Sequence, residues 1–166
     1  MPIHTIAPIY DEHSVVLILG SFPSVRSREV GFFYGHPQNR FWRVLAAVFR
    51  APVPETVKEK TDFLLQHHIA LWDVAASCDI QGSSDSTLCH VVPNDLTPIL
   101  STAPICRIFV NGATAAKYYD RLIRPKIGRD ATLLPSTSPA NATWSLERLV
   151  KTWRIISEII KNGPEA

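Results

Sequence analysis

The sequence has little of what marks a secreted, disulfide-stabilised or membrane-spanning protein. Its 166 residues include three cysteines, Cys78, Cys89 and Cys106, an odd number without CxxC spacing, so a disulfide framework is not expected. No apolar run approaches the roughly 20 residues that cross a bilayer. The N-terminal segment lacks the basic and apolar regions of a signal peptide. We therefore expect a cytoplasmic protein with free thiols.

Motifs of the common nucleotide, hydrolase and metal sites are also absent. The sequence contains no GxGxxG, no P-loop, no GxSxG and no HExxH. Five side chains that can ligate metals lack the spacing of known sites: His67, His68, Cys78, Cys89 and His90. We therefore expect neither a cofactor nor a metal. The formal net charge of +2 is too small to require a polyanionic partner or to exclude one.

Short apolar segments alternate with helical patterns along the chain. We expect strands at Ser14–Gly20, Ile69–Val74, Ile105–Asn111 and Ala131–Pro135. Apolar spacing and an alanine-rich stretch predict helices over 41–49, 113–123 and 146–160, and Thr56 with Glu59 fits a capping box before another helix. This order predicts an α/β fold with a parallel sheet covered on both faces. The ordinary globular composition predicts one domain, residues 1–166.

The segment Gly20–Trp42 follows the first predicted strand and concentrates polar and aromatic side chains. Ligands of open α/β sheets bind beyond the carboxyl ends of the strands, so this segment is a candidate site. Phe32, Phe33 and Tyr34 either form a stacking surface for a planar ligand or partly fill the core. Asn39 stands just before a predicted helix, where composition alone favours a helix cap.

Two further polar loops leave predicted strands at the same edge. Leu134–Ala142 is rich in small hydroxyl residues and proline, and its backbone amides suit either an anion or an ordinary β-to-α connection. Asp79–Asp85 follows the second strand, with Asp73 and Ser77 upstream. The sequence assigns this loop no defined role.

Three ordered motifs resemble the uracil-DNA glycosylase superfamily: GSFPS at Gly20–Ser24, FFYGHPQNRFW at Phe32–Trp42 and STSPANA at Ser136–Ala142. The likeness runs from about Val15 to Trp153. In detail it is similar to the hypoxanthine-DNA glycosylase branch, also called DNA-deoxyinosine glycosylase, which is related to the mismatch-specific uracil-DNA glycosylases. The resemblance implies a three-layer αβα sandwich around a four-stranded, mainly parallel sheet, and chemistry without metal or cofactor.

The resemblance also implies an activity. Superfamily members flip a damaged base out of DNA and hydrolyse its N-glycosidic bond in base-excision repair, because the bond cannot be reached inside the stack. Hypoxanthine is the leading substrate; uracil release and lesion binding without catalysis are the alternatives. No lysine lies in the three motifs, so a Schiff base is not expected and the enzyme should be monofunctional. The implied partner is DNA containing deaminated bases, bound by a monomer.

Site residues follow from the resemblance position by position. Mismatch-specific uracil enzymes place the water with an asparagine in the turn where this chain has Phe22. In the hypoxanthine branch the catalytic asparagine matches Asn39, which would orient the water and contact sugar or base. An aromatic ring that stacks on the flipped base matches Tyr34.

The remaining predicted contacts fall into three groups. The residues predicted to contact the base are Tyr34, Phe22, Ser21 and Asn111. The residues predicted to contact DNA are Pro23, Ser24, Ser136, Thr137, Ser138, Pro139, Ala140 and Asn141, where Pro139 to Asn141 replace the usual leucine wedge. Candidates for phosphate contacts, or else ordinary surface charges, are Arg26, Arg28, Arg40 and Arg43.

Overall fold

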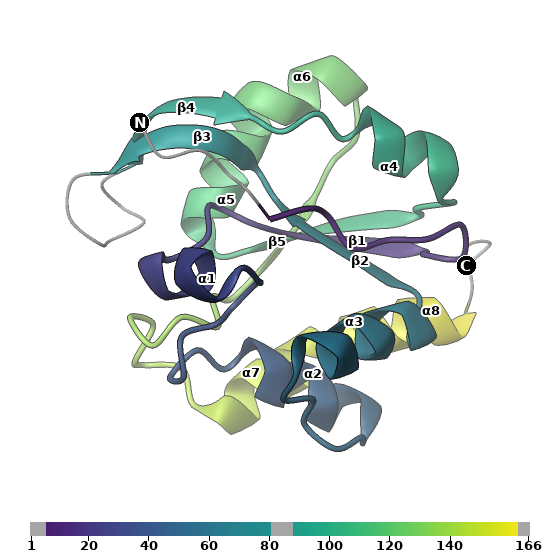
Figure 1. Cartoon of the computed structure of the whole chain (residues 1–166). Helices are drawn as coiled ribbons and strands as arrows, with labels where there is room; N and C mark the ends of the chain where they lie inside the picture. The colour runs from purple at the N-terminus through teal and green to yellow at the C-terminus, as the bar shows by residue number, and fades with distance from the viewer. Residues whose placement is uncertain (1–5, 81–87, 163–166) are drawn as a thin grey trace.

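The computed structural model describes residues 6–80 and 88–162, and a four-stranded parallel sheet forms their centre. The strands follow the order β2-β1-β5-β6 (Figure 1). They span Val16–Gly20 (β1), Ile69–Asp73 (β2), Arg107–Asn111 (β5) and Thr132–Leu134 (β6). All five residues of β1 are buried, as expected for the middle of a sheet covered on both faces. The four predicted strands are confirmed.

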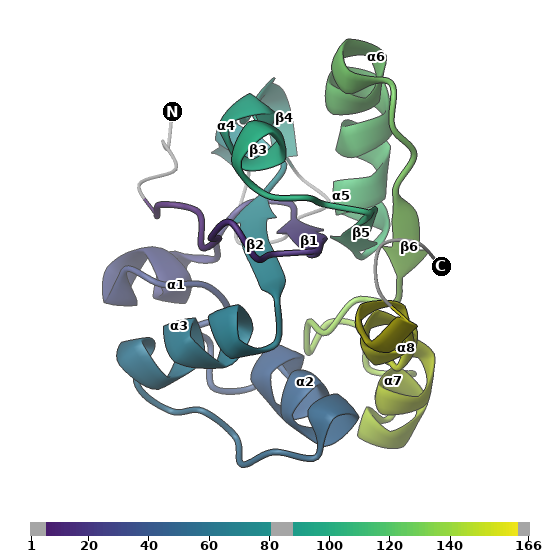
Figure 2. The same ribbon diagram turned by 90° about the vertical axis from the view of Figure 1, so that its right-hand side faces the viewer.

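Helices cover the two faces of the sheet (Figures 1 and 2). One face carries α2 (Phe41–Phe49), α3 (Val57–Gln66), α7 (Leu146–Trp153) and α8 (Ile155–Asn162). The other carries α4 (Thr97–Thr102), α5 (Ala113–Tyr118), the π-helical turn η2 (Tyr119–Ile123) and α6 (Arg124–Ile127). Val16 and Ile18 of β1 point into the first core, and Leu17 and Leu19 into the second. The predicted three-layer αβα sandwich is confirmed.

An antiparallel hairpin follows β2 where the sequence predicted only a loop. β3 (Ala75–Ile80) pairs with β4 (Leu88–Pro93), so Asp79 and Ile80 belong to a strand, while residues 81–87 of the predicted loop lie outside the described part of the chain. The Asn94 side chain donates to the carbonyl oxygens of Asp73 (2.9 Å) and Ala75 (3.2 Å). These two bonds fix the hairpin to the end of β2.

The predicted capping box starts α3. The Thr56 hydroxyl accepts from the Glu59 backbone N–H at 3.0 Å, and the Glu59 carboxylate accepts from the N–H groups of Thr56 (3.2 Å) and Glu55 (2.9 Å). The two backbone donors lower the pKa of the Glu59 carboxyl. Two exposed N–H groups at the helix start are thereby satisfied, and the prediction is confirmed.

The C-terminal helical pattern is divided in the structure. α7 and α8 are separated at Arg154, where one continuous helix was predicted. Trp153 ends α7 fully buried, with its ring edge-on to Phe41 at a centroid distance of 5.9 Å. Its indole N–H donates to the carbonyl of Pro135 at 3.0 Å. Trp153 therefore holds α7, α2 and the segment after β6 together.

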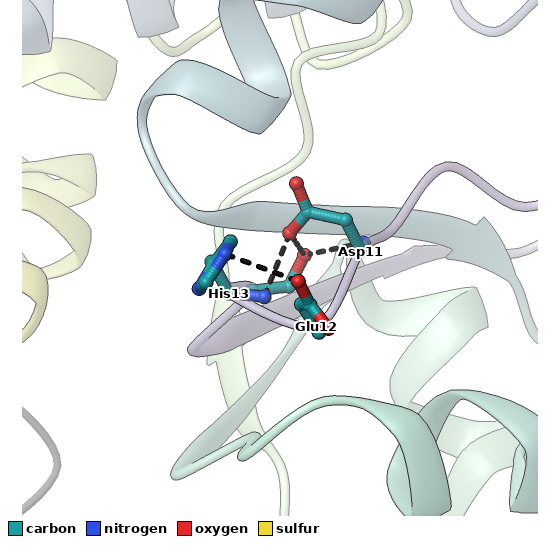
Figure 3. A network of polar contacts seen from close by, with 4 residues as sticks. Asp11, Glu12 and His13 are labelled. Carbon is teal, nitrogen blue, oxygen red and sulfur yellow. Dashed lines mark hydrogen bonds and ion pairs between the residues drawn. The ribbon is translucent and has the colours of Figure 1, made fainter.

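A short turn leads into β1, and Figure 3 shows its side chains. The Asp11 carboxylate accepts from the His13 backbone N–H at 2.8 Å, and the Ser14 N–H donates to the Asp11 carbonyl at 3.2 Å. His13 and Glu12 lie 3.4 Å apart with both side chains exposed, so this pair contributes little to stability. The backbone bonds of the turn set the entry of the chain into the sheet.

None of the helices that the structure describes is both long enough and apolar enough to span a bilayer.

The packing of Trp153 predicts a large stability loss on truncation. Trp153→Ala removes a fully buried ring and one hydrogen bond, and we expect the free energy of unfolding in urea to fall by about 3–5 kcal/mol. Leu146→Ala, on the same helix at a side chain that is 39% exposed, should cost less than about 1 kcal/mol. Equal losses for the two variants would contradict the proposed anchoring role.

Candidate active site

Segments far apart in the sequence meet at the carboxyl end of the sheet, on the left of Figure 1. The turn after β1, the segment entering α2 and the segment between β6 and α7 all lie there. Gly20 shows how closely they approach, because a Cβ at this position would collide with the Asp73 carboxylate and the Tyr34 hydroxyl. A larger residue at the end of β1 would displace these two polar side chains, and glycine lets both lie close to the backbone.

Tyr34 is the only one of the three neighbouring rings that stays partly exposed. Phe32 and Phe33 are 6% and 2% exposed and belong to the core, as one of the two interpretations expected. The Tyr34 ring stacks on Phe41 at a centroid distance of 4.0 Å, and its hydroxyl accepts from Asn111 Nδ2 at 3.2 Å. Its φ of 52° is unfavourable for a non-glycine residue, so these contacts hold the ring in a strained backbone conformation.

Asn39 sits at the start of α2 with its side-chain oxygen fully engaged. Oδ1 accepts from the backbone N–H of Phe41 at 2.9 Å and from the Thr137 hydroxyl at 2.9 Å. Arg40 occupies the N-cap position of α2, but its side chain makes no capping hydrogen bond. Asn39 therefore satisfies the first helical N–H, and the same side chain lies among the candidate site residues.

Thr137 and Asn111 continue this chain of hydrogen bonds. Asn111 Oδ1 accepts from the Thr137 backbone N–H, and Asn111 Nδ2 donates to the Thr137 hydroxyl, both at 3.1 Å. This series of hydrogen bonds, Tyr34–Asn111–Thr137–Asn39, links the segment before α2, the end of β5 and the segment after β6. Thr137 is fully buried, so its side chain serves this network and is not on the exposed surface of the loop, and the predicted contact of Thr137 with DNA stays a prediction. Both N–H groups of Asn111 are used inside the protein, which leaves a base only its oxygen.

Arg40 binds the segment between β6 and α7 rather than pointing to solvent. Its guanidinium donates to the carbonyl oxygens of Trp144, Ser138 (3.0 Å) and Asn141 (3.1 Å), and its backbone N–H donates to the Thr137 carbonyl (3.1 Å). These carbonyls take donors from the two terminal nitrogens of the guanidinium, whereas Nε is buried without a hydrogen-bond partner among the described residues. The prediction of Arg40 as a phosphate contact is therefore corrected: Arg40 holds the loop in place.

The rest of that loop is folded by its own side chains. The hydroxyls of Ser136 and Ser138 accept from the backbone N–H groups of Ser138 and Ala140, each at 3.1 Å, and Asn141 Nδ2 donates to the Ser136 carbonyl at 3.0 Å. Pro139 and Ala140 are exposed at the tip. The loop therefore presents a small apolar tip on a hydrogen-bonded base.

The Phe22 ring packs beside the β3–β4 hairpin. It is 6% exposed, clusters with Ala75 and Cys78, and lies under the Arg28 guanidinium at 5.5 Å from the ring centroid. Arg28 therefore covers an aromatic ring where a phosphate contact was predicted. The turn position that carries an asparagine in the mismatch-specific enzymes contributes apolar packing in this chain.

The other residues of the first motif support the local backbone. Ser21 is 7% exposed and its carbonyl accepts from Ala75 N–H at 3.0 Å. Pro23 is buried, and the exposed Ser24 caps α1 (Val25–Val30) by accepting from the Ser27 N–H at 3.1 Å. The Arg43 side chain is exposed, whereas that of Arg26 lies outside the described part.

Asp73 is a site residue to which the sequence assigned no defined role. Its side chain is 3% exposed at the end of β2, beside Gly20 and the Tyr34 hydroxyl. The available signal was a carboxylate that ends an apolar strand at the ligand-binding edge of the sheet.

The described residues contain no group of three or more histidine, cysteine, aspartate or glutamate side chains placed to hold a metal ion. Cys78 and Cys106 are free thiols. The side chain of Cys89 lies outside what the structure describes.

Comparisons with known proteins identify the family of this chain. The family model of the uracil DNA glycosylase superfamily matches residues 7–158. A protein of Methanosarcina acetivorans named hypoxanthine DNA glycosylase is 33% identical over 141 residues, covering 84% of this chain and 89% of its own. A protein of the same name from Methanosarcina barkeri is 28% identical over 135 residues, covering 81% and 85%.

The fold has a solved counterpart. The solution NMR structure of a candidate uracil DNA glycosylase from Methanosarcina acetivorans superposes with a TM-score of 0.77 at 28% identity, covering 93% of this chain and 98% of that one. Sheet, helical layers and motifs therefore all point to one group of proteins. This chain belongs to the uracil-DNA glycosylase superfamily.

Proposed function

We propose that this protein is a monofunctional DNA glycosylase that releases hypoxanthine from deoxyinosine in base-excision repair. As a member of its superfamily it is a DNA glycosylase, a hydrolase of N-glycosyl bonds. The single observation that carries the proposal is the position of Asn39, fixed at the carboxyl edge of the sheet and connected by hydrogen bonds to Tyr34. The choice of base is supported by two relatives that are named hypoxanthine DNA glycosylase.

Uracil release is the alternative within this class. Against it stands Phe22, which fills the turn position where mismatch-specific uracil enzymes carry their asparagine and which packs into an apolar cluster. A lesion-binding module without catalysis is the alternative from another class. A partly buried hydrogen-bonded network that orients one amide at the site favours an enzyme over such a module.

Tyr34 would hold the flipped base. Its ring stacks on Phe41 and stays partly exposed, and a base would stack on the exposed part of the ring. Such a stack is worth roughly 1–3 kcal/mol, comparable to the few kcal/mol needed to extrude a nucleotide. A ring fixed by Phe41 and by Asn111 loses little conformational freedom when the base arrives.

Catalysis would be mainly electrostatic. As the glycosidic bond breaks, positive charge grows on the sugar and negative charge on the departing purine, and fixed dipoles stabilise that separation without reorganising. The network holds Asn39 ready before the substrate binds. No residue of the network needs a metal or a cofactor for this role.

DNA would contact the exposed part of the segment between β6 and α7. Pro139 and Ala140 are placed to enter the space that the flipped nucleotide leaves, while Arg40 keeps the loop rigid behind them. Ser136, Ser138 and Asn141, with Ser24 on α1, would lie close to the backbone of a DNA bound there by one copy of the protein. Buried Thr137 is left out of this set.

The substrate assignment predicts a rank order of bases. Duplex oligonucleotides carrying one deoxyinosine, deoxyuridine or deoxyxanthosine, incubated with excess enzyme, should break only after alkali, and fastest at deoxyinosine. A duplex with deoxyadenosine at the same position is the control. Faster release of uracil would overturn the choice of base. If the folded protein released no base from any of the three duplexes, its assignment as a DNA glycosylase would be overturned.

The role of Asn39 predicts a catalytic loss without a folding defect. Asn39→Ala should lower the single-turnover rate on deoxyinosine by about 100- to 1,000-fold, the usual effect of removing one preorganised polar group. Gln38→Ala, at the exposed neighbour, should cleave like the parent. Circular dichroism and thermal melting check that both variants fold, and a fully active Asn39→Ala would refute the assignment.

The stacking role of Tyr34 can be separated from its hydrogen bond. Tyr34→Ala removes the ring and should weaken productive binding by about 10- to 100-fold, measured as the enzyme concentration that gives half the maximal single-turnover rate. Tyr34→Phe keeps the ring and removes the hydroxyl that accepts from Asn111, so its loss should be smaller. Equal losses for the two would place the stack on another ring.

A further inference from the structure

We propose that Thr137 is a positioning residue that, with the backbone N–H of Phe41, holds the Asn39 amide in one orientation, so that Asn39 acts on the substrate as a hydrogen-bond donor. The proposal rests on the glycosylase function above. It narrows the role expected from the sequence, in which Asn39 orients a water molecule and contacts the sugar or base, to a hydrogen bond donated by its NH2 group.

The orientation of the Asn39 amide follows from its contact with a backbone N–H group, which can donate a hydrogen bond but cannot accept one. A backbone N–H only donates, so the Asn39 atom at 2.9 Å from the Phe41 nitrogen must be the oxygen and not the NH2 group. The amide of Asn111 is fixed by the same logic, because its oxygen accepts from the backbone N–H of Thr137. Two main-chain groups thus determine the orientation of both side-chain amides.

The fixed amides then determine the role of the Thr137 hydroxyl. Asn111 Nδ2 points at this hydroxyl at 3.1 Å, so the hydroxyl oxygen accepts there. Its single hydrogen is left for Asn39 Oδ1 at 2.9 Å. A hydroxyl has one donor and two acceptor lone pairs, and this assignment satisfies every partner. Thr137 is fully buried, so water does not compete for these bonds.

The consequence for Asn39 is a carbonyl with no acceptor capacity left. Both lone pairs of Oδ1 are used by Phe41 and Thr137, so this oxygen has none for a proton of the attacking water. Among the residues that the structure describes, none accepts a hydrogen bond from Nδ2 of Asn39. The NH2 group is therefore the part of Asn39 that can serve the reaction.

A donor suits the leaving group of the proposed reaction. Hypoxanthine presents ring nitrogens and an exocyclic oxygen as acceptors, and negative charge accumulates on them as the glycosidic bond breaks. A hydrogen bond to a group that becomes charged strengthens in the transition state, which accelerates the reaction. Asn39 donates a hydrogen bond and transfers no proton, so its own protonation does not change during the reaction.

The first test replaces the donor with an acceptor. Asn39→Asp keeps the shape and the two bonds to Oδ1, but an ionised carboxylate only accepts. We expect Asn39→Asp to cleave deoxyinosine no faster than Asn39→Ala at neutral pH in single turnover. If Asn39 instead orients water through its oxygen, a carboxylate can take over that role, and Asn39→Asp would be faster than Asn39→Ala. That result would overturn the proposal.

The second test isolates the hydroxyl of Thr137. Thr137→Val keeps the size and removes the donor, and we expect about a tenfold lower single-turnover rate with the Kd for an abasic duplex unchanged within twofold. Thr137→Ser restores the hydroxyl and should restore the rate. A Thr137→Val variant with a normal rate, or a Thr137→Ser variant as slow as Thr137→Val, would overturn the proposed role.

A measurement without substrate separates this inference from the proposed function. The NH2 protons of Asn111 bond inside the protein, whereas those of Asn39 bond to no described residue, so NMR should show slower exchange with solvent for Asn111. Substitution of each residue assigns its signals. Equal protection of the two amides would overturn the inference even if the wild type released hypoxanthine. An inactive wild type with the expected exchange difference would reject only the function.

Discussion

The site depends on one buried residue whose polar groups are all satisfied. Thr137 is fully buried, yet its N–H, carbonyl and hydroxyl bond to Asn111, to the backbone of Arg40 and to Asn39. Leaving one such group unpaired costs about 1–3 kcal/mol, so the three segments cannot separate without a large penalty. The geometry of the site is therefore set by main-chain and hydroxyl bonds in the interior, and the exposed loop tip at Pro139 and Ala140 can meet DNA without disturbing it.

The parts of the fold that depend on local sequence could be predicted. Apolar runs bounded by polar turns marked the four sheet strands, and the capping box at Thr56 and Glu59 marked the start of α3. The β3–β4 hairpin could not be predicted, because it is fixed by Asn94 bonding back to the end of β2. The break at Arg154 was missed for a related reason: apolar spacing continues across it, and only the two helices seen in the structure reveal it.

The residue types of the site could be predicted from the sequence, but the hydrogen bonds that join these residues could not. The motifs named Asn39 and Tyr34, and the stacking preference for Tyr34 stays a prediction that the burial of its aromatic neighbours favours. The true partner of Asn39 is 98 residues away, and Arg40 reaches a carbonyl 104 residues away. No local pattern distinguishes a guanidinium that will bind a phosphate from one that will bind a loop. For Thr137 the resemblance implied a contact with DNA, whereas packing makes it the most buried side chain of that loop.

The packing of the site gives a physical reason for Phe22 in the first motif, at the position where mismatch-specific uracil enzymes carry an asparagine. An amide in that turn would have to be satisfied beside the apolar cluster of Ala75 and Cys78, whereas a phenyl ring packs there at no polar cost. The amide at Asn39 is instead placed where a helix N–H and a buried hydroxyl occupy its oxygen. With its oxygen held in this way, the Asn39 amide presents its NH2 group to the substrate in the proposed role. A donor lowers the barrier most for a base that leaves with high negative charge, which is the demand that a departing purine makes on Asn39.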